Sequence, residues 1–159
     1  MTEKKLEIVA PPGKTHFTTR RVVDAPASLV WEAFTKPAYI ARWMGPSRLT
    51  MTSCESDLRV GGSWRMVYRA PDGQEYAFHG VFRELERPVR IVRTFVFEAH
   101  PDEEAVETLR LDERDGKTTV HTETVHKTVA GRDGHLSGVE GMVEGFARLD
   151  ALLAELSAR

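Results

Sequence analysis

Residues 138–156 read GVEGMVEGFARLDALLAEL, and their pattern decides the fold. At about 100° per residue, the apolar side chains of this stretch form one stripe along a helix. The stripe comprises Val139, Met142, Val143, Phe146, Leu149, Leu153 and Leu156. Three glycines, Gly138, Gly141 and Gly145, lie along one edge of it, although each glycine inside a helix costs about 1 kcal/mol relative to alanine. The pattern predicts a long, half-buried helix whose apolar stripe needs a partner.

The bulk composition predicts an ordinary soluble protein of one domain. The chain has 159 residues, of which 41% are hydrophobic and 29% charged, and its net charge is -2. Interspersed charges of both signs argue against nucleic-acid binding. No apolar run approaches the roughly 20 residues of a membrane span, and the first residues do not resemble a signal peptide. We therefore expect a cytoplasmic protein without membrane insertion.

Upstream of the helix, the pattern is mostly strands. Residues 1–14 are expected to form a flexible N-terminal arm, and residues 15–158 a single domain. Residues 15–24 alternate like a strand, after which 24–37 and 38–46 have the period of two short helices. Six further strands are expected over 49–56, 63–70, 75–86, 90–98, 105–113 and 117–127. Because these strands are joined by short links, they are most simply antiparallel.

This order of elements predicts an α+β fold in which a curved antiparallel sheet surrounds the C-terminal helix. A sheet with one apolar face needs a cover, and the largest unpaired apolar stripe is the one at 138–156. The three glycines then have two interpretations, which the sequence leaves open. Either a neighbouring backbone comes close to the helix, or the missing side chains leave space for a cavity between helix and sheet.

Four stretches carry a resemblance to a known family. APASLVWEAFTKPAYIARWMGP, DLRVGGSWRMVYRAPDG, HGVFRELERPVRIVRTF and EGFARLDALL occur in an order similar to that of the C-terminal domain of the heat-shock-protein-90 ATPase activator. That family belongs to the START-related, polyketide-cyclase and plant-allergen (SRPBCC) superfamily. The resemblance covers about residues 15–156. It implies a helix-grip fold: a seven-stranded antiparallel sheet curled round a long C-terminal helix, two short helices closing one end, and a cavity between.

The resemblance also implies a set of functions. Superfamily members bind lipids, polyketides, hormones or other hydrophobic small molecules, and a minority catalyse reactions on them. We therefore expect the chain to bind or sequester a hydrophobic small molecule, with Gly138, Gly141 and Gly145 shaping the cavity. The expected ligand-binding residues are Trp43, Trp64, Met66, Tyr68, Phe78, Phe95, Met142 and Phe146. For several of these aromatic and methionine side chains, the alternative is plain core packing.

An enzyme of cyclase or hydrolase type is a further alternative. It would use Tyr68, His79, or an acid–base pair formed by His121 and Glu123, which share one face of a strand. Both histidines also have a simpler interpretation as solvent-facing residues. The sequence has no metal-binding motif such as HExxH or CxxC, and no motif for a nucleotide cofactor. Neither a metal nor another cofactor is expected.

Two kinds of protein partner follow from the sequence. The family name suggests a stress-related partner of a chaperone ATPase. However, only about 14 residues precede the first expected strand, so we expect no counterpart here of the eukaryotic activator's separate N-terminal domain. An edge strand of an open sheet can pair with a second copy, which would give a homodimer. Cys54 is the only cysteine, which excludes an internal disulfide.

Overall fold

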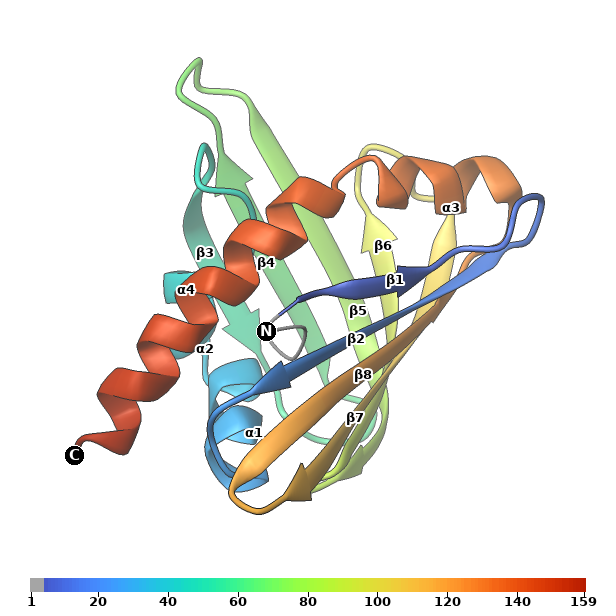
Figure 1. The fold of residues 1–159 in the computed structure, drawn as a ribbon. Coiled ribbons are helices and arrows are strands. Elements are labelled where there is room, and N and C mark those ends of the chain that lie inside the picture. Colours follow the sequence, from blue (N-terminus) through green and yellow to red (C-terminus); the bar gives the residue numbers. More distant parts are fainter. Residues whose placement is uncertain (1–4) are drawn as a thin grey trace.

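A curved antiparallel sheet and a long C-terminal helix dominate the structure, a computed structural model that describes residues 5–159 (Figure 1). The strands are β1 (Glu7–Val9), β2 (His16–Val23), β3 (Thr50–Ser56), β4 (Ser63–Arg69), β5 (Glu75–Glu86), β6 (Arg90–Phe97), β7 (Glu104–Arg114) and β8 (Lys117–Val125). The helices are α1 (Ala27–Thr35), α2 (Pro37–Trp43), α3 (Val129–Leu136) and α4 (Val139–Ser157). The expected α+β, helix-grip architecture is confirmed.

The sheet order is β1-β2-β8-β7-β6-β5-β4-β3, and every neighbouring pair is antiparallel. Strands β3 to β8 form a meander, and β2 closes onto β8 with Phe17 opposite Thr124. The expected count of seven strands is wrong by one within residues 5–159. The eighth is β1, which pairs with β2 and lies inside the stretch expected to be a flexible arm; residues 1–4 of that arm lie outside the described residues.

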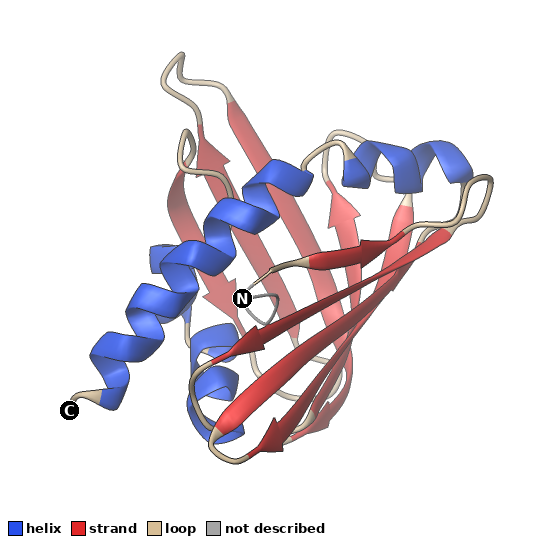
Figure 2. Cartoon of the chain, in the orientation of Figure 1, coloured by secondary structure: helices blue, strands red, loops and turns tan. Residues whose placement is uncertain are grey.

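Helix α4 lies across the concave side of the sheet, as Figure 2 shows. Its buried side chains include Leu149 and Leu153, which are at most 1% exposed and join one apolar core with residues of α1, α2 and the strands. The predicted apolar stripe is therefore correct for most of its length. Val143 is the exception, since it is 54% exposed.

Helices α1 and α2 close one end of the sheet, as expected. Pro37 starts α2 at its first turn, where a missing N–H costs nothing. Trp43, the last residue of α2, is buried against Phe34 and Phe146, and its indole Nε1 donates to the Ala33 carbonyl at 2.8 Å. This bond ties the two short helices together beneath α4.

A third short helix, α3, was not predicted. It follows β8 directly, and the Thr128 hydroxyl caps it by accepting from the Gly131 N–H at 2.9 Å. The helix lacks a clear apolar stripe and contains Gly131 and Gly134, which explains why its pattern does not stand out in the sequence. It sits beyond the N-terminal end of α4 and covers the far end of the concave sheet (Figure 1).

Candidate functional site

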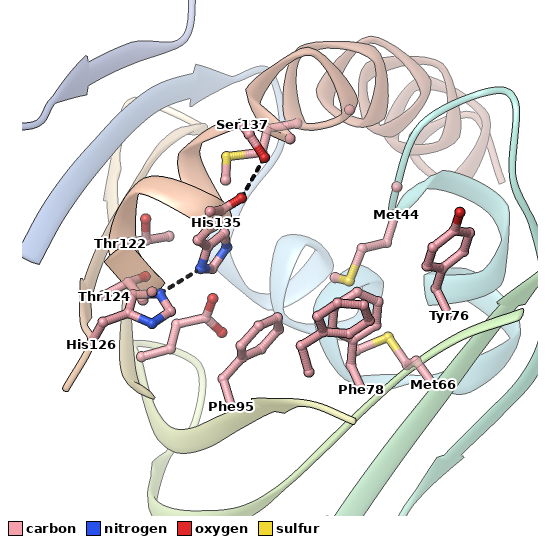
Figure 3. A pocket seen from close by; sticks show the side chains of 18 of the residues that line it. Met44, Met66, Tyr76, Phe78, Phe95, Thr122, Thr124, His126, His135 and Ser137 are labelled. Carbon is pink, nitrogen blue, oxygen red and sulfur yellow. Dashed lines mark hydrogen bonds between the residues drawn. The ribbon is translucent and has the colours of Figure 1, made fainter. Parts of the chain in front are cut away.

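A cavity of about 1220 Å³ lies between the concave face of the sheet and the helices. Its walls come from β2, β4 to β8, all four helices, the loop that joins α2 to β3 and the loop that joins β6 to β7. Figure 3 shows the two chemical ends of this cavity: aromatic and methionine side chains at one end, and histidines with threonines at the other. Ligand pockets typically occupy about 300–1,000 Å³. The space is therefore large enough for a drug-sized molecule.

The apolar end is built from stacked side chains of β4, β5 and β6. Phe78 is the centre of this group: its ring lies 5.4 Å from that of Phe95 and 5.0 Å from that of Phe97, and Tyr68 meets it edge-on at 5.8 Å. Met66 and Met44 also line this end. Because methionine adapts its shape and sulfur contacts aromatic rings favourably, this wall can accommodate ring systems of different outline.

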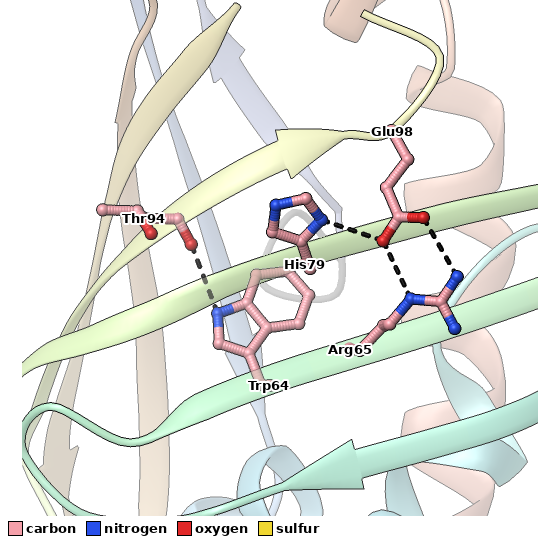
Figure 4. Close-up of polar contacts among 5 residues, drawn as sticks. All are labelled: Trp64, Arg65, His79, Thr94 and Glu98. Atoms are coloured by element: carbon pink, nitrogen blue, oxygen red, sulfur yellow. Dashed lines mark hydrogen bonds and ion pairs between the residues drawn. The ribbon is translucent and has the colours of Figure 1, made fainter. Parts of the chain in front are cut away.

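Most of the predicted ligand-binding residues line this cavity. They are Trp43, Met66, Tyr68, Phe78, Phe95, Met142 and Phe146. Trp64 does not line it. Trp64 is 3% exposed, and its Nε1 donates to the Thr94 carbonyl at 3.2 Å (Figure 4). The Arg93 guanidinium lies 4.1 Å from the centroid of the indole ring. Trp64 is therefore a core residue beside the cavity wall.

The three glycines of α4 also line the cavity, but two of them have a neighbour at packing distance. A Cβ on Gly145 would lie 3.0 Å from the Trp43 carbonyl oxygen, and one on Gly141 would lie 3.0 Å from the Pro46 ring. Beside Gly138 such an atom would meet only the carbonyl oxygen of His135, at 3.6 Å. Close approach of a neighbouring segment, one of the two interpretations of the sequence, therefore accounts for Gly141 and Gly145.

The loop that approaches α4 is held in place by polar side chains of the same helix. Arg148 donates to the carbonyl oxygens of Trp43 and Gly45 and to the Ser47 hydroxyl, and Glu144 accepts from the Ser47 N–H at 3.1 Å. A larger residue at position 145 would push against this fixed loop. The cavity wall is therefore rigid at this point.

The polar end of the cavity centres on two histidines. Nε2 of His126, just after β8, lies 3.0 Å from Nδ1 of His135 on α3 (Figure 3). Nδ1 of His126 is buried without a hydrogen bond and lies 3.8 Å from a carboxylate oxygen of Glu103. The His135 ring stacks on Phe95 with 5.0 Å between centroids and meets Phe17 edge-on. The same ring therefore belongs to both ends of the cavity.

An ion pair completes this end. Arg93 on β6 and Glu107 on β7 are directly opposite in the sheet, and Nε of Arg93 donates to the Glu107 carboxylate at 2.7 Å. Burial alone would raise the pKa of Glu107, but the Arg93 charge and hydrogen bond outweigh it and hold that pKa below its usual value. The carboxylate is therefore ionised and compensated at neutral pH.

Burial governs the protonation of the two histidines. It lowers the pKa of His135 to about 4, against the opposing charge of Glu107, and it also lowers the pKa of His126. Both imidazoles are neutral near pH 7 and can each donate one hydrogen bond and accept another. Burial raises the pKa of Tyr68 to about 12, so its phenol stays protonated.

The other predicted acid–base residues lie outside this site. His79 faces away from the cavity, where Nδ1 lies 2.8 Å from Glu98, and Arg65 holds the same carboxylate with two hydrogen bonds (Figure 4). His121 and Glu123 alternate with the cavity-lining Thr122 and Thr124, so they lie on the outer face. Of the residues named for catalysis, the structure therefore brings only Tyr68 to the cavity.

Comparison with known proteins places this arrangement in a family. The model of the activator of Hsp90 ATPase homolog 1-like family matches residues 24–156. The chain belongs to this family. The resemblance seen in the sequence is thereby confirmed.

Solved structures of similar bacterial proteins share the fold of this activator-homolog-like protein. One from Rhodobacter sphaeroides is 28% identical with a TM-score of 0.84, covering 94% of this chain and 99% of that one. One from Chromobacterium violaceum is 27% identical with a TM-score of 0.75, covering 87% and 96%. One from Nitrosomonas europaea is 25% identical with a TM-score of 0.79, covering 89% and 95%. A search of the curated proteins finds no match.

Three further observations concern the part of the chain that the structure describes. Within residues 5–159, no three histidine, cysteine or acidic side chains gather in a way that could hold a metal ion. Over the same residues, every helix is too short or too polar to cross a membrane. Cys54 is half-buried beside the core, and burial raises the pKa of its thiol.

Most of the polar end of the cavity was not predicted from the sequence. His126 continues the alternation of Thr122 and Thr124, and all three residues line the cavity. The sequence pattern did not single out His135, because α3 was not predicted and Leu136 is the one apolar residue among the glycine, serine and charged residues at 131–138. The available signal was Thr128, a cap residue directly after a strand, which marks a helix start.

Proposed function

We propose that this protein binds a hydrophobic small molecule in the cavity between the curved sheet and helices α3 and α4. The single observation that carries the proposal is the cavity itself, about 1220 Å³ with a mainly apolar lining that includes aromatic and methionine side chains. A folded chain normally fills such a space with side chains, since interiors are close-packed. The unfilled cavity on the concave side of the sheet supports a role in binding another molecule.

The geometry also supports a defined orientation of that molecule. Phe78, Phe95 and Tyr68 offer ring faces and edges at one end, whereas His135 and the Arg93–Glu107 pair offer polar groups at the other. Pockets that combine an apolar wall with a few convergent polar groups are typical of specific small-molecule sites. An amphiphilic ligand fits this division better than a uniformly apolar one.

Titration with N-phenyl-1-naphthylamine, a fluorescent apolar probe, tests the proposal. Wild-type protein is expected to enhance its fluorescence with saturation at one molecule per chain. Met142 lines the cavity on α4, so Met142→Trp should fill part of it and weaken binding at least tenfold. Val143→Trp is the matched control, because Val143 is the next residue on the helix and is 54% exposed. Equal binding by both variants, or no saturable binding by the wild type, would contradict the proposal.

A second candidate function rests on the family description alone. A match to the activator of Hsp90 ATPase family over residues 24–156 supports a test for a chaperone partner. The cognate chaperone's ATPase rate would be measured with and without a molar excess of this protein. An unchanged rate, together with no co-purification, would exclude this role.

A further inference from the structure

The hydrogen bond between His126 and His135 requires one of the two nitrogens to carry the proton. The partners are Nε2 of His126 and Nδ1 of His135, 3.0 Å apart. A neutral imidazole has one N–H and one lone pair, so the direction of this bond fixes the tautomers of both rings. It also fixes whether the remaining nitrogen of His135 can donate or accept.

The surroundings of His126 decide that direction. Its Nδ1 is buried, makes no hydrogen bond to a described residue, and lies 3.8 Å from the Glu103 carboxylate. That carboxylate is fixed in place, because it accepts from the N–H and the hydroxyl of Thr128 at 3.0 and 2.8 Å. A lone pair on Nδ1 would be repelled by the negative oxygen, whereas an N–H is attracted to it. His126 is therefore protonated on Nδ1.

The proton on Nδ1 of His126 fixes the position of the ring proton on His135. His126 accepts through Nε2, so Nδ1 of His135 carries a proton and donates to it. Nε2 of His135 is left with a lone pair and makes no hydrogen bond to any residue from 5 to 159. The ring is clamped by stacking on Phe95 and by the edge-on contact with Phe17, and it lines the cavity (Figure 3).

We propose that the ligand is a ring-bearing apolar molecule with a neutral hydroxyl group, and that Nε2 of His135 accepts the hydrogen bond from this hydroxyl. This assignment deepens the proposed function and rests on it. Glu103 and His126 are positioning residues, because they set the tautomer of His135, the residue whose Nε2 accepts from the ligand. The apolar body of the ligand would lie along Phe95 and Phe78.

The charges at this end of the cavity favour a hydroxyl over a carboxylic acid. Arg93 is already paired with Glu107, and the Glu103 carboxylate stands behind His126. An anionic ligand group here would face two carboxylates and only one guanidinium, which is already engaged. The low pKa values of both histidines keep these rings from supplying a positive charge near pH 7.

Matched ligands test the proposal on the wild-type protein. Calorimetric titrations would compare 2-naphthol with 2-methoxynaphthalene, which has the same rings but cannot donate a hydrogen bond. The ether is the more apolar of the two, so burial alone favours it. We expect 2-naphthol to bind about three- to tenfold more tightly, the range of one net hydrogen bond. Equal affinities or a preference for the ether would overturn the assignment and leave cavity binding intact. Failure of both to bind would overturn the proposed function as well.

A variant tests whether His135 causes the preference for 2-naphthol. His135→Phe keeps a flat ring against Phe95 but removes both nitrogens, and it should abolish the preference for 2-naphthol while the ether still binds. His79→Phe, on the outer face of the sheet, is the matched control and should keep it. The ratio of the two affinities is the readout, because a change in stability does not alter it in folded protein. A preference that survives in His135→Phe would overturn the assignment.

Long-range ¹H–¹⁵N spectra of the wild-type histidines provide a test that needs no variant. Both His126 and His135 are expected to be protonated on Nδ1 and unprotonated on Nε2 near pH 7. In Glu103→Gln the charge that fixes His126 is lost, although an amide oxygen can still accept from Thr128, and the preference for 2-naphthol should shrink. A proton on Nε2 of His135 in the wild type would overturn the proposal.

Discussion

Gly145 of α4 lies against the backbone of Trp43, so closely that a Cβ at position 145 would be 3.0 Å from the Trp43 carbonyl oxygen. Arg148, one turn further along α4, donates to that same oxygen. The helix and the end of α2 therefore meet backbone to backbone at this point. Gly145 and Trp43 both line the cavity, so this contact forms part of its wall.

Gly145→Ala is expected to lower the free energy of unfolding by about 1 kcal/mol, because overpacking outweighs the gain in helix propensity. Gly134→Ala is the matched control, since no atom lies within 4 Å of its added Cβ. That control should raise the free energy of unfolding by about 0.5–1 kcal/mol. Urea denaturation measures both variants. Stabilisation of similar size at both positions would show that the close approach at Gly145 is unimportant.

Arg21 and Asp150 link β2 to α4 through two hydrogen bonds, of 2.6 and 3.3 Å. The Arg21 side chain is only 6% exposed, so Asp150→Ala would leave a buried guanidinium without its partner. We expect a loss of about 2–3 kcal/mol in the free energy of unfolding. The double variant Arg21→Met, Asp150→Leu should recover most of this loss. A double variant as unstable as Asp150→Ala would mean that packing, rather than the unpaired charge, causes the effect.

Stability should fall on acidification because of His135. Burial lowers its pKa to about 4 from a reference value of 6.5. Between these pH values the unfolded chain takes up a proton that the folded chain refuses, so stability is lost as the pH falls. His135→Phe should reduce the slope of unfolding free energy against pH by up to about 1.4 kcal/mol per pH unit in this window. Denaturation curves measured from pH 7 to 4.5 give this slope for both proteins. Equal slopes in the wild type and in His135→Phe would contradict the lowered pKa of His135.

Trp64→Phe should separate core packing from ligand binding. The variant loses the hydrogen bond to the Thr94 carbonyl and weakens the contact with Arg93, which together should cost about 1–2 kcal/mol of stability. Its affinity for N-phenyl-1-naphthylamine should stay within twofold of the wild type, because Trp64 lies outside the cavity lining. A tenfold loss of affinity in folded protein would place Trp64 in the binding site after all.

The sequence predicted the strands and helices whose periodicity is strong. Helix α4 was expected over 138–156 and spans Val139–Ser157, because its apolar stripe repeats for five turns. Strand β1 was missed, since three residues between polar and proline-rich stretches have no readable alternation. Its place in the sheet depends on pairing with β2, a tertiary interaction that a local pattern does not contain.

The candidate site was predictable at its apolar end only. Alternation along β4 correctly placed Met66 and Tyr68 on the inward face, but it could not distinguish them from Trp64, which shares that face. Sheet curvature and the Thr94 and Arg93 contacts decide that difference. The polar end combines Glu103 from the β6–β7 loop, His126 from just after β8 and His135 from α3, and their convergence depends on this unpredicted helix.

Methyl NMR of methionine-labelled protein tests the central claim most directly. Met44, Met66 and Met142 line the cavity from the α2–β3 loop, from β4 and from α4, whereas Met51 packs against the core outside the lining. On titration with N-phenyl-1-naphthylamine, the account predicts saturable shifts of the three cavity methyl signals and little change at Met51. Shifts confined to Met51, or none at all under conditions where the probe binds, would show that the molecule binds elsewhere and contradict the account.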